Sequence, residues 1–160
     1  MQPLWRAYEA VVNCVAIGLF SAMVAVTTLG VFFRYVLNNA LPWAEEADRY
    51  LFIWLSFVGA SITMRYKGHI AVDLLLRYVS VRSRHLLALV AQAAILLFLA
   101  LVFWASLPVL ELTSETRATA TDIPMVWVYV AAPVGCVLIG IETLRLMGRT
   151  VREMRQGAAA

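Results

Sequence analysis

One stretch of the sequence, Val11–Phe33, runs for 23 residues without a charged side chain. As an α-helix it would be roughly 34 Å long, enough to cross the hydrocarbon core of a bilayer. It is too long for the apolar part of a cleavable secretory signal, so we interpret it as an uncleaved span. Leu86–Leu110 and Ile123–Ile141 are also uncharged, and 62% of the 160 residues are hydrophobic. A soluble chain of this length could not bury so much apolar surface, which indicates an integral membrane protein.

A fourth span is predicted from a shorter run. Tyr50–Met64 has 15 uncharged residues, which alone are too few to cross comfortably. Pro42 fits the first turn of a helix, and the acidic residues that follow it suit a helix N-terminus. A helix over residues 42–66 would be roughly 37 Å long, with its first two turns in the interface and the rest spanning.

These runs predict an all-α integral membrane protein with four transmembrane helices in one domain over residues 1–155. The spans are expected at about residues 11–33, 42–66, 86–110 and 123–145. Pro108 is predicted to kink or end the third helix near its outer end. Pro124 is expected in the first turn of the fourth helix, and Pro133 predicts a kink within it.

The segment between the second and third spans predicts a short amphipathic helix that lies in the membrane interface. Residues 70–81 are too few and too charged to span, although most of their side chains are apolar. Asp73 and Arg77 stand four residues apart and therefore share one face of a helix. After the last span, residues 156–160 are expected to form a disordered tail.

The distribution of positive charge predicts the orientation of the chain. Ten of the 13 lysines and arginines lie near the two ends and in the middle loop, and three lie in the other two loops. Because cytoplasmic loops carry an excess of lysine and arginine, both ends and the middle loop are predicted to face the cytoplasm. The connections 34–49 and 111–122 would then face outward.

The composition argues against several classes of function. The net charge is +3, without the continuous basic surface of a nucleic-acid-binding protein. Cys14 and Cys136 lie in apolar runs and lack the spacing of a zinc site. His69 and His85 lie in the middle loop, so no span offers an axial haem ligand. We therefore expect no catalytic residue, no cofactor and no metal, and we expect that the protein is not an enzyme.

Ionisable residues are missing from the centres of the predicted spans, where pumps and proton-coupled carriers place them. The nearest case is Glu142, at the cytoplasmic end of the fourth span. It precedes Arg145 by three residues, and we interpret the two as a local ion pair near the headgroups rather than as a proton site. The chain itself therefore shows no transport pathway.

Two dense polar patches remain at the ends of spans. The hairpin patch comprises Arg34, Asn39, Trp43, Glu45, Glu46 and Arg49, and the middle-loop patch comprises Gly68, His69 and Asp73. Both patches are open to two interpretations. In one interpretation the residues only stabilise helix ends, with Glu45 paired to Arg49 at a helix start and Gly68 ending the second helix. The other is a pair of contact surfaces for partner proteins.

The patches also combine several short motifs. These are Phe33-Arg34-Tyr35-Val36, Asn39, Pro42-Trp43, Glu45-Glu46, Arg49-Tyr50 and, after a span with Trp54, Gly68-His69-Ile70 with Val72-Asp73. In this combination the sequence resembles the small permease subunit of the TRAP (tripartite ATP-independent periplasmic) transporters. The likeness covers nearly the whole chain, although the part from Leu86 onward matches only in hydropathy.

The resemblance implies both a role and partners. Such a subunit pairs with a large multi-spanning membrane subunit, which carries the substrate and sodium sites, in the bacterial cytoplasmic (inner) membrane. A periplasmic substrate-binding protein captures an organic acid of the dicarboxylate, keto acid or sugar acid class, and a sodium gradient drives its uptake. The small subunit would be a scaffold that helps dock the binding protein. The residues of both patches then become candidate partner contacts, with membrane lipids as further partners.

An alternative is an autonomous small transporter that works as an oligomer. The small multidrug exporters resemble this chain in having four short spans, but they carry an essential carboxylate in mid-span, which is missing here. A membrane enzyme or electron carrier is opposed by the lack of histidines within the spans and of paired cysteines.

Overall fold

The computed structural model describes residues 2–66 and 81–157, and its regular structure there is helical. The helices are α1 (Gln2–Tyr35), α2 (Pro42–Arg65), α4 (Val81–Thr113), α5 (Val126–Tyr129) and α6 (Ala131–Gly157). The predicted all-α class is confirmed. The predicted interfacial helix over residues 70–81 falls outside the described residues except for Val81, which begins α4. Of the predicted tail, Gln156 and Gly157 belong to α6, and residues 158–160 lie outside the description.

Among the described residues, three helices are long and apolar enough to cross a membrane. They are Leu4–Tyr35, His85–Thr113 and Val126–Gln156. The first two contain the first and third predicted spans, and the last overlaps the fourth, which was predicted three residues too early at its start and eleven too early at its end. Helix α2 occupies the region of the second predicted span. It is not one of the three, and the acidic residues Glu45, Glu46 and Asp48 lie in its first turns. The fold is thus that of a multi-pass helical membrane protein.

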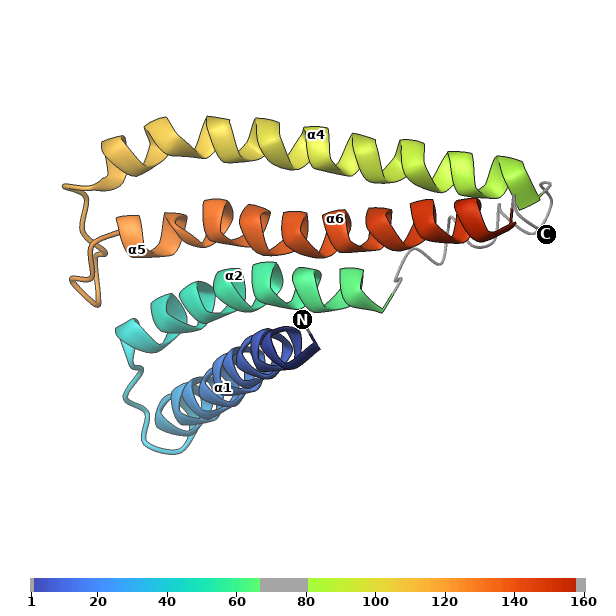
Figure 1. The fold of residues 1–160 in the computed structure, drawn as a ribbon. Coiled ribbons are helices and arrows are strands. Elements are labelled where there is room, and N and C mark those ends of the chain that lie inside the picture. The colour runs from blue at the N-terminus through green and yellow to red at the C-terminus, as the bar shows by residue number, and fades with distance from the viewer. Residues whose placement is uncertain (1, 67–80, 158–160) are drawn as a thin grey trace.

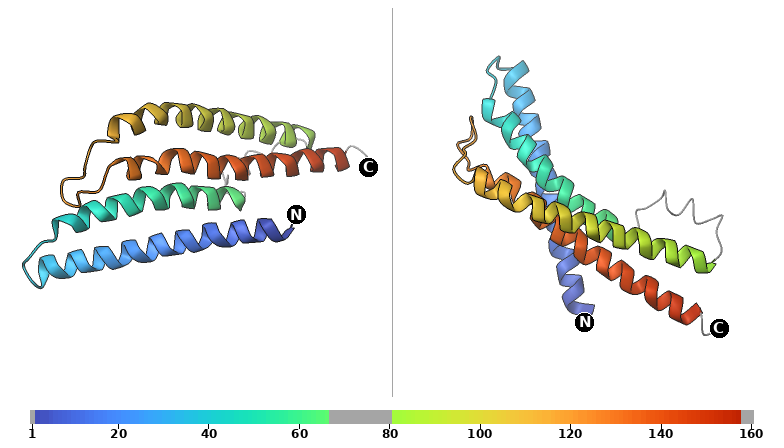
Figure 2. Two further views of the ribbon diagram at one scale, coloured as in Figure 1. Left: turned by 60° about the vertical axis from the view of Figure 1, so that its left-hand side comes forward. Right: turned by 90° about the horizontal axis from the view of Figure 1, so that it is seen from above.

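The helices lie in a row rather than around a central axis. Figure 1 shows α4 along one edge, α6 and α2 inside, and α1 along the other edge, and the left view of Figure 2 shows the same order. The main contacts join α1 to α2, α2 to α6, and α6 to α4. Each inner helix therefore packs on two neighbours, whereas the edge helices expose long apolar faces, such as Leu97, Phe98 and Trp104 on α4.

The turn between α1 and α2 depends on one asparagine. Asn38 has φ 49°, in the left-handed region that asparagine tolerates better than most residues. The backbone N–H of the next residue, Asn39, donates to the carbonyl of Phe33 at 3.0 Å and so completes the end of α1. The chain then reverses and enters α2 at Pro42, whose fixed φ suits the first helical turn, as predicted.

Two prolines with similar predictions have different effects. Helix α4 continues through Pro108 and ends only at Thr113, so this proline does not end the helix. The last span, by contrast, is divided into α5 and α6 at Val130, three residues before Pro133. Pro133 has no N–H to donate to the carbonyl of Tyr129, and its ring crowds that carbonyl, which explains the interruption there. Pro124 lies two residues before α5 rather than in its first turn.

The inner helices approach each other closely at a glycine. A Cβ atom placed on Gly135 of α6 would lie 2.3 Å from Cδ1 of Phe57 on α2. A similar but looser contact occurs between α1 and α2, where a Cβ atom on Gly30 would lie 3.4 Å from Cβ of Ala44. Small residues at helix contacts are typical of membrane proteins, in which packing and hydrogen bonds hold helices together.

Candidate functional site

The hairpin patch is built from the end of α1 and the start of α2. The guanidinium of Arg34 donates a hydrogen bond from Nη2 to Oε1 of Glu45, and both side chains are exposed. Glu45 thus pairs with Arg34 across the turn and not with Arg49, which the helical spacing had indicated. Arg49 forms no ion pair with any residue in the described part of the chain. The α1–α2 contact is completed by the hydroxyl of Thr27, which donates to Oδ2 of Asp48 at 2.8 Å.

The carboxylate of Glu46 binds the connection between α4 and α5. Its Oε1 accepts the backbone N–H of Thr119 at 3.1 Å. Its Oε2 accepts the N–H groups of Ala120 and Thr121 at 3.1 and 2.8 Å, and the hydroxyl of Thr121 at 2.9 Å. Loss of solvent raises the pKa of Glu46, but the hydrogen bonds from Thr121 and Ala120 outweigh it and hold this pKa below its ordinary value. The carboxylate therefore fixes the α4–α5 connection to α2.

Replacing Glu46 with alanine is expected to loosen the α4–α5 connection. The N–H groups of residues 119–121 lose their acceptor, so their hydrogen exchange should become several-fold faster while exchange in α2 stays unchanged. The measurement is hydrogen–deuterium exchange on the purified chain. Glu115→Ala is the matched control, because Glu115 is an exposed carboxylate of the same connection with no hydrogen bond among the described residues. Equal acceleration in both variants would show that Glu46 does not hold this segment.

The other predicted residues of the hairpin patch stay at the surface. Asn39 and Trp43 are exposed, and their side chains make no hydrogen bond within residues 2–66 and 81–157. Arg49 borders a cavity of about 540 Å³ between α2 and the α4–α5 connection, together with Glu46 and Tyr50. The predicted residues of the middle-loop patch, Gly68, His69 and Asp73, lie outside the described residues.

A second polar region, not predicted from the sequence, lies at the opposite end of the helices. Nε of Arg65, at the end of α2, lies 3.1 Å from Oε1 of Glu142 on α6. The two side chains are only 8% and 1% exposed. Nη1 of Arg65 also donates to Oδ1 of Asn13 on α1 at 3.3 Å. The local pair predicted for Glu142 exists only weakly, because Nη1 of Arg145 is 4.0 Å from Oε2 of Glu142.

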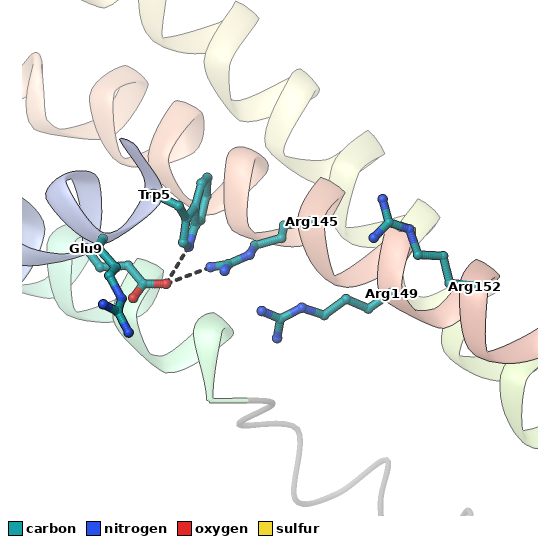
Figure 3. Close-up of a pocket in the computed structure, with 7 residues that line it drawn as sticks. Trp5, Glu9, Arg145, Arg149 and Arg152 are labelled. Carbon is teal, nitrogen blue, oxygen red and sulfur yellow. Dashed lines mark hydrogen bonds and ion pairs between the residues drawn. The ribbon is translucent and has the colours of Figure 1, made fainter. Parts of the chain in front are cut away.

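A neighbouring ion pair joins α1 to α6. Nη1 of Arg145 lies 2.7 Å from Oε1 of Glu9, which also accepts the indole N–H of Trp5. Figure 3 shows both contacts meeting at Glu9. The guanidinium carbon of Arg145 lies 3.9 Å from the centre of the Trp5 ring, a cation–π contact. We call Glu9, Arg65, Glu142 and Arg145 the buried charge network, in which Arg65 and Glu142 are buried and Glu9 and Arg145 are 30% and 28% exposed.

The buried charge network is balanced, with two arginines and two glutamates from three helices. It lies near the start of α1 and at the end of α2, but Glu142 and Arg145 lie near the middle of α6 rather than at the end of the last span, where the sequence placed Glu142. Within the described residues, no group of three or more histidine, cysteine, aspartate or glutamate side chains could hold a metal ion. The arrangement is suited to fixing three helices against one another. The sequence did contain a signal for this network. The second and fourth predicted spans each end with charged residues, and both of these ends are predicted to lie on the same side of the membrane.

Three curated relatives resemble this chain over different lengths. The C4-dicarboxylate TRAP transporter small permease protein DctQ of Vibrio cholerae is 40% identical over 77 residues, 48% of this chain and 33% of that protein. The isethionate TRAP transporter permease protein DctMQ of Oleidesulfovibrio alaskensis is 26% identical over 139 residues, 82% of this chain and 22% of that protein. The sialic acid TRAP transporter small permease protein SiaQ of Vibrio cholerae is 23% identical over 144 residues, 90% of this chain and 83% of that protein. The chain thus spans less than half of the first two and most of the third.

The family match covers more of the chain than the 40% identical segment does. Residues 23–155 match the family described as "Tripartite ATP-independent periplasmic transporters, DctQ component". This range runs from the middle of α1 almost to the end of α6, so it includes both the hairpin patch and most of the buried charge network. The match confirms the resemblance that the sequence motifs indicated. This chain is therefore a multi-pass protein of the bacterial inner membrane and belongs to the DctQ component family, the small permease proteins of the TRAP transporters.

Proposed function

We propose that this chain is the small membrane subunit of a sodium-driven TRAP transporter and that it acts as a scaffold for a large transport subunit. The family match over residues 23–155 carries the proposal. The distribution of charge supports it, because α1, α2 and α4 carry their Asp, Glu, Lys, Arg and His residues toward their ends, and Glu142 near the middle of α6 is paired with Arg65. Such a chain offers a substrate or an ion no polar path of its own.

The isethionate relative supports a large membrane subunit as partner. That permease protein is named DctMQ, and this chain corresponds to 22% of its length, as expected if a small and a larger subunit are joined there. The substrate would be a small organic acid, of the dicarboxylate, keto acid or sugar acid class. Relatives named for a C4-dicarboxylate and for sialic acid support this class.

We further propose that α2 is a fourth span and that both ends of the chain face the cytoplasm. The packing of α2 between α1 and α6, which both belong to helices long and apolar enough to span, supports the fourth span. Its charged first turns then lie at the surface beside the α1–α2 turn. The ten-to-three division of lysine and arginine supports the inward orientation of the ends.

In this orientation the hairpin patch faces the periplasm, where a substrate-binding protein docks. Asn39, Trp43 and Arg49 are the proposed contacts, because their side chains are exposed and are not used by the described fold. Arg34, Glu45 and Glu46 would support them by fixing the turn and the neighbouring connection. Gly68, His69 and Asp73 remain proposed contacts to a partner on the cytoplasmic side.

Reconstitution into proteoliposomes tests the proposed function. The chain alone is expected to take up no labelled dicarboxylate, keto acid or sugar acid. The chain together with its large membrane subunit and binding protein is expected to take up one of them when sodium is present outside. Uptake by the chain alone would contradict the scaffold role, and uptake that ignores the sodium gradient would contradict the coupling.

The variant Trp43→Ala/Arg49→Ala is expected to lower uptake by the complete transporter several-fold at an unchanged level of the chain in the membrane. The two changes remove a large exposed ring and a guanidinium that forms no ion pair with the described residues, and aromatic and arginine side chains dominate many interfaces. Arg117→Ala is the matched control, because Arg117 is an exposed arginine of the α4–α5 connection that pairs with Asp122. If the control lowers uptake equally, the effect does not belong to the hairpin patch.

A further inference from the structure

A wide, positively charged cavity lies between the start of α1 and the second half of α6. It has a volume of about 690 Å³ and is lined by Trp5, Arg6, Glu9, Arg145, Gly148, Arg149 and Arg152. Four of these seven residues are arginines, and Glu9 is the one carboxylate. Figure 3 shows the side chains of Arg145, Arg149 and Arg152 extending from α6 toward the side where Trp5 and Glu9 lie.

The charges of this cavity are not balanced within the described chain. Glu9 is already paired, since it accepts from Arg145 at 2.7 Å. Arg6, Arg149 and Arg152 form no ion pair or hydrogen bond with any residue among 2–66 and 81–157. Three positive charges therefore remain around one open volume.

The spacing of the arginines along α6 makes the excess of positive charge unfavourable unless an anion is bound. Arg145, Arg149 and Arg152 stand four and three residues apart, so they share one face, and like charges at these spacings repel. The negative end of the helix dipole offers little compensation, because its effect is confined to the last turn and α6 continues to Gly157. An anion held in the cavity would relieve this repulsion.

The position of the cavity indicates what kind of anion reaches it. It lies at the ends of two membrane-spanning segments, Leu4–Tyr35 and Val126–Gln156, where headgroups meet the protein. Trp5 lines it, and tryptophan concentrates at this level of a bilayer. On α6, the exposed apolar residues Val137 and Ile141 precede Arg145 by eight and four residues on the same face. A ligand with a phosphate at the arginines and an acyl chain along this apolar face would match both parts.

We propose that this cavity binds the headgroup phosphate of an anionic glycerophospholipid, with Arg149 and Arg152 as its principal contacts. Guanidinium groups match the geometry of phosphate oxygens and form charge-assisted hydrogen bonds with them. Basic pockets between membrane helices are suited to anionic headgroups in this way. The bound lipid would join the first and last spans at one face of the membrane, next to the buried charge network.

Lipid retention by the full-length chain, purified in mild detergent with any subunit that accompanies it, tests the proposal. Native mass spectrometry would measure apparent affinity for phosphatidylglycerol and for phosphatidylcholine. The parent is expected to prefer phosphatidylglycerol, and Arg149→Gln/Arg152→Gln is expected to weaken that binding by about tenfold or more. Arg149→Lys/Arg152→Lys should recover part of it. The matched control is Arg155→Gln, which removes an exposed arginine of α6 that does not line the cavity.

Three outcomes would overturn the assignment. Equal weakening by Arg155→Gln would mean that the lipid responds only to the total charge of α6. Displacement of phosphatidylglycerol by excess inorganic phosphate would mean that the cavity holds a free phosphate rather than a lipid. Loss of an accompanying subunit from the double glutamine variant, with lipid retention unchanged, would mean that a protein surface occupies the cavity. A circular dichroism spectrum equal to that of the parent confirms that each variant is folded.

Discussion

Replacing Arg65 with methionine is expected to destabilise the folded chain by about 3–5 kcal/mol, the usual cost of removing one partner from a buried ion pair. The carboxylate of Glu142 is 1% exposed and would lose the Nε donor that lies 3.1 Å away. Arg145, whose Nη1 is 4.0 Å from the other oxygen of Glu142, places the expected loss near the lower end of that range. Methionine keeps most of the volume of the arginine stem, so the loss reports on charge rather than on a cavity.

The double variant Arg65→Met/Glu142→Met is the sharper test of the same pair. A buried ion pair replaced as a whole by apolar side chains of similar size is often nearly neutral, so this variant is expected to be within about 1–2 kcal/mol of the parent. Glu142→Met alone, which leaves the Arg65 charge buried, should resemble Arg65→Met. The measurement is reversible unfolding in mixtures of sodium dodecyl sulfate and mild detergent, followed by helical circular dichroism.

The exposed ion pair between Arg117 and Asp122 supplies the control. Its side chains are 62% and 81% exposed, so Arg117→Met should change stability by no more than about 1 kcal/mol. If the losses from Arg65→Met and Glu142→Met simply add in the double variant, then the two side chains are not coupled. The buried charge network would in that case not fix α2 against α6.

The sequence predicts the helices of this protein better than it predicts their partners. Long uncharged runs and local proline positions determine where helices form, so Val11–Phe33 and Leu86–Leu110 both lie within observed helices. Which side chains form ion pairs depends on how the turns bring the helices together. Glu45 satisfied a helical spacing with Arg49, yet the turn through Asn38 brings Arg34 to it instead.

Long-range contacts explain the remaining differences. Glu142 had a local candidate in Arg145, but its closer partner is Arg65, which lies 77 residues earlier in the chain. The carboxylate of Glu46, a residue of the hairpin patch, accepts hydrogen bonds from residues 73 to 75 positions later, which the sequence did not predict. Sequence spacing within one helix cannot reveal either contact, because both depend on which helices become neighbours in the row.

Gly135→Ala is expected to destabilise the chain by about 1–3 kcal/mol, as overpacking of a close contact usually does. The added Cβ would lie 2.3 Å from Cδ1 of Phe57 and 2.6 Å from its Cβ and Cγ. Rotation of the ring can move Cγ and Cδ1, but Cβ of Phe57 is fixed to the backbone of α2. The two inner helices must therefore separate to accept the methyl group.

Gly140→Ala, the same substitution five residues later on α6, is the control, and its expected effect on stability has the opposite sign. A Cβ on Gly140 meets nothing within 4 Å, so Gly140→Ala should stabilise α6 by up to about 1 kcal/mol through helix propensity. Equal effects of the two alanines in the unfolding assay would mean that Gly135 makes no special contact.

Separation of α2 from α6 at Gly135 should also weaken the ion pair between Arg65 and Glu142 in the buried charge network. Gly135 precedes Glu142 by seven residues on α6, and Phe57 precedes Arg65 by eight on α2, so both contacts lie along one helix interface. A variant that moves these helices apart lengthens the ion pair between Arg65 and Glu142, so part of the stabilisation from this pair is already lost before Arg65 is replaced. Gly135→Ala combined with Arg65→Met should therefore cost less than the sum of the two single changes. Strict additivity would instead mean that α2 and α6 bend locally around residue 135 and that the helix row is more pliable than a scaffold requires.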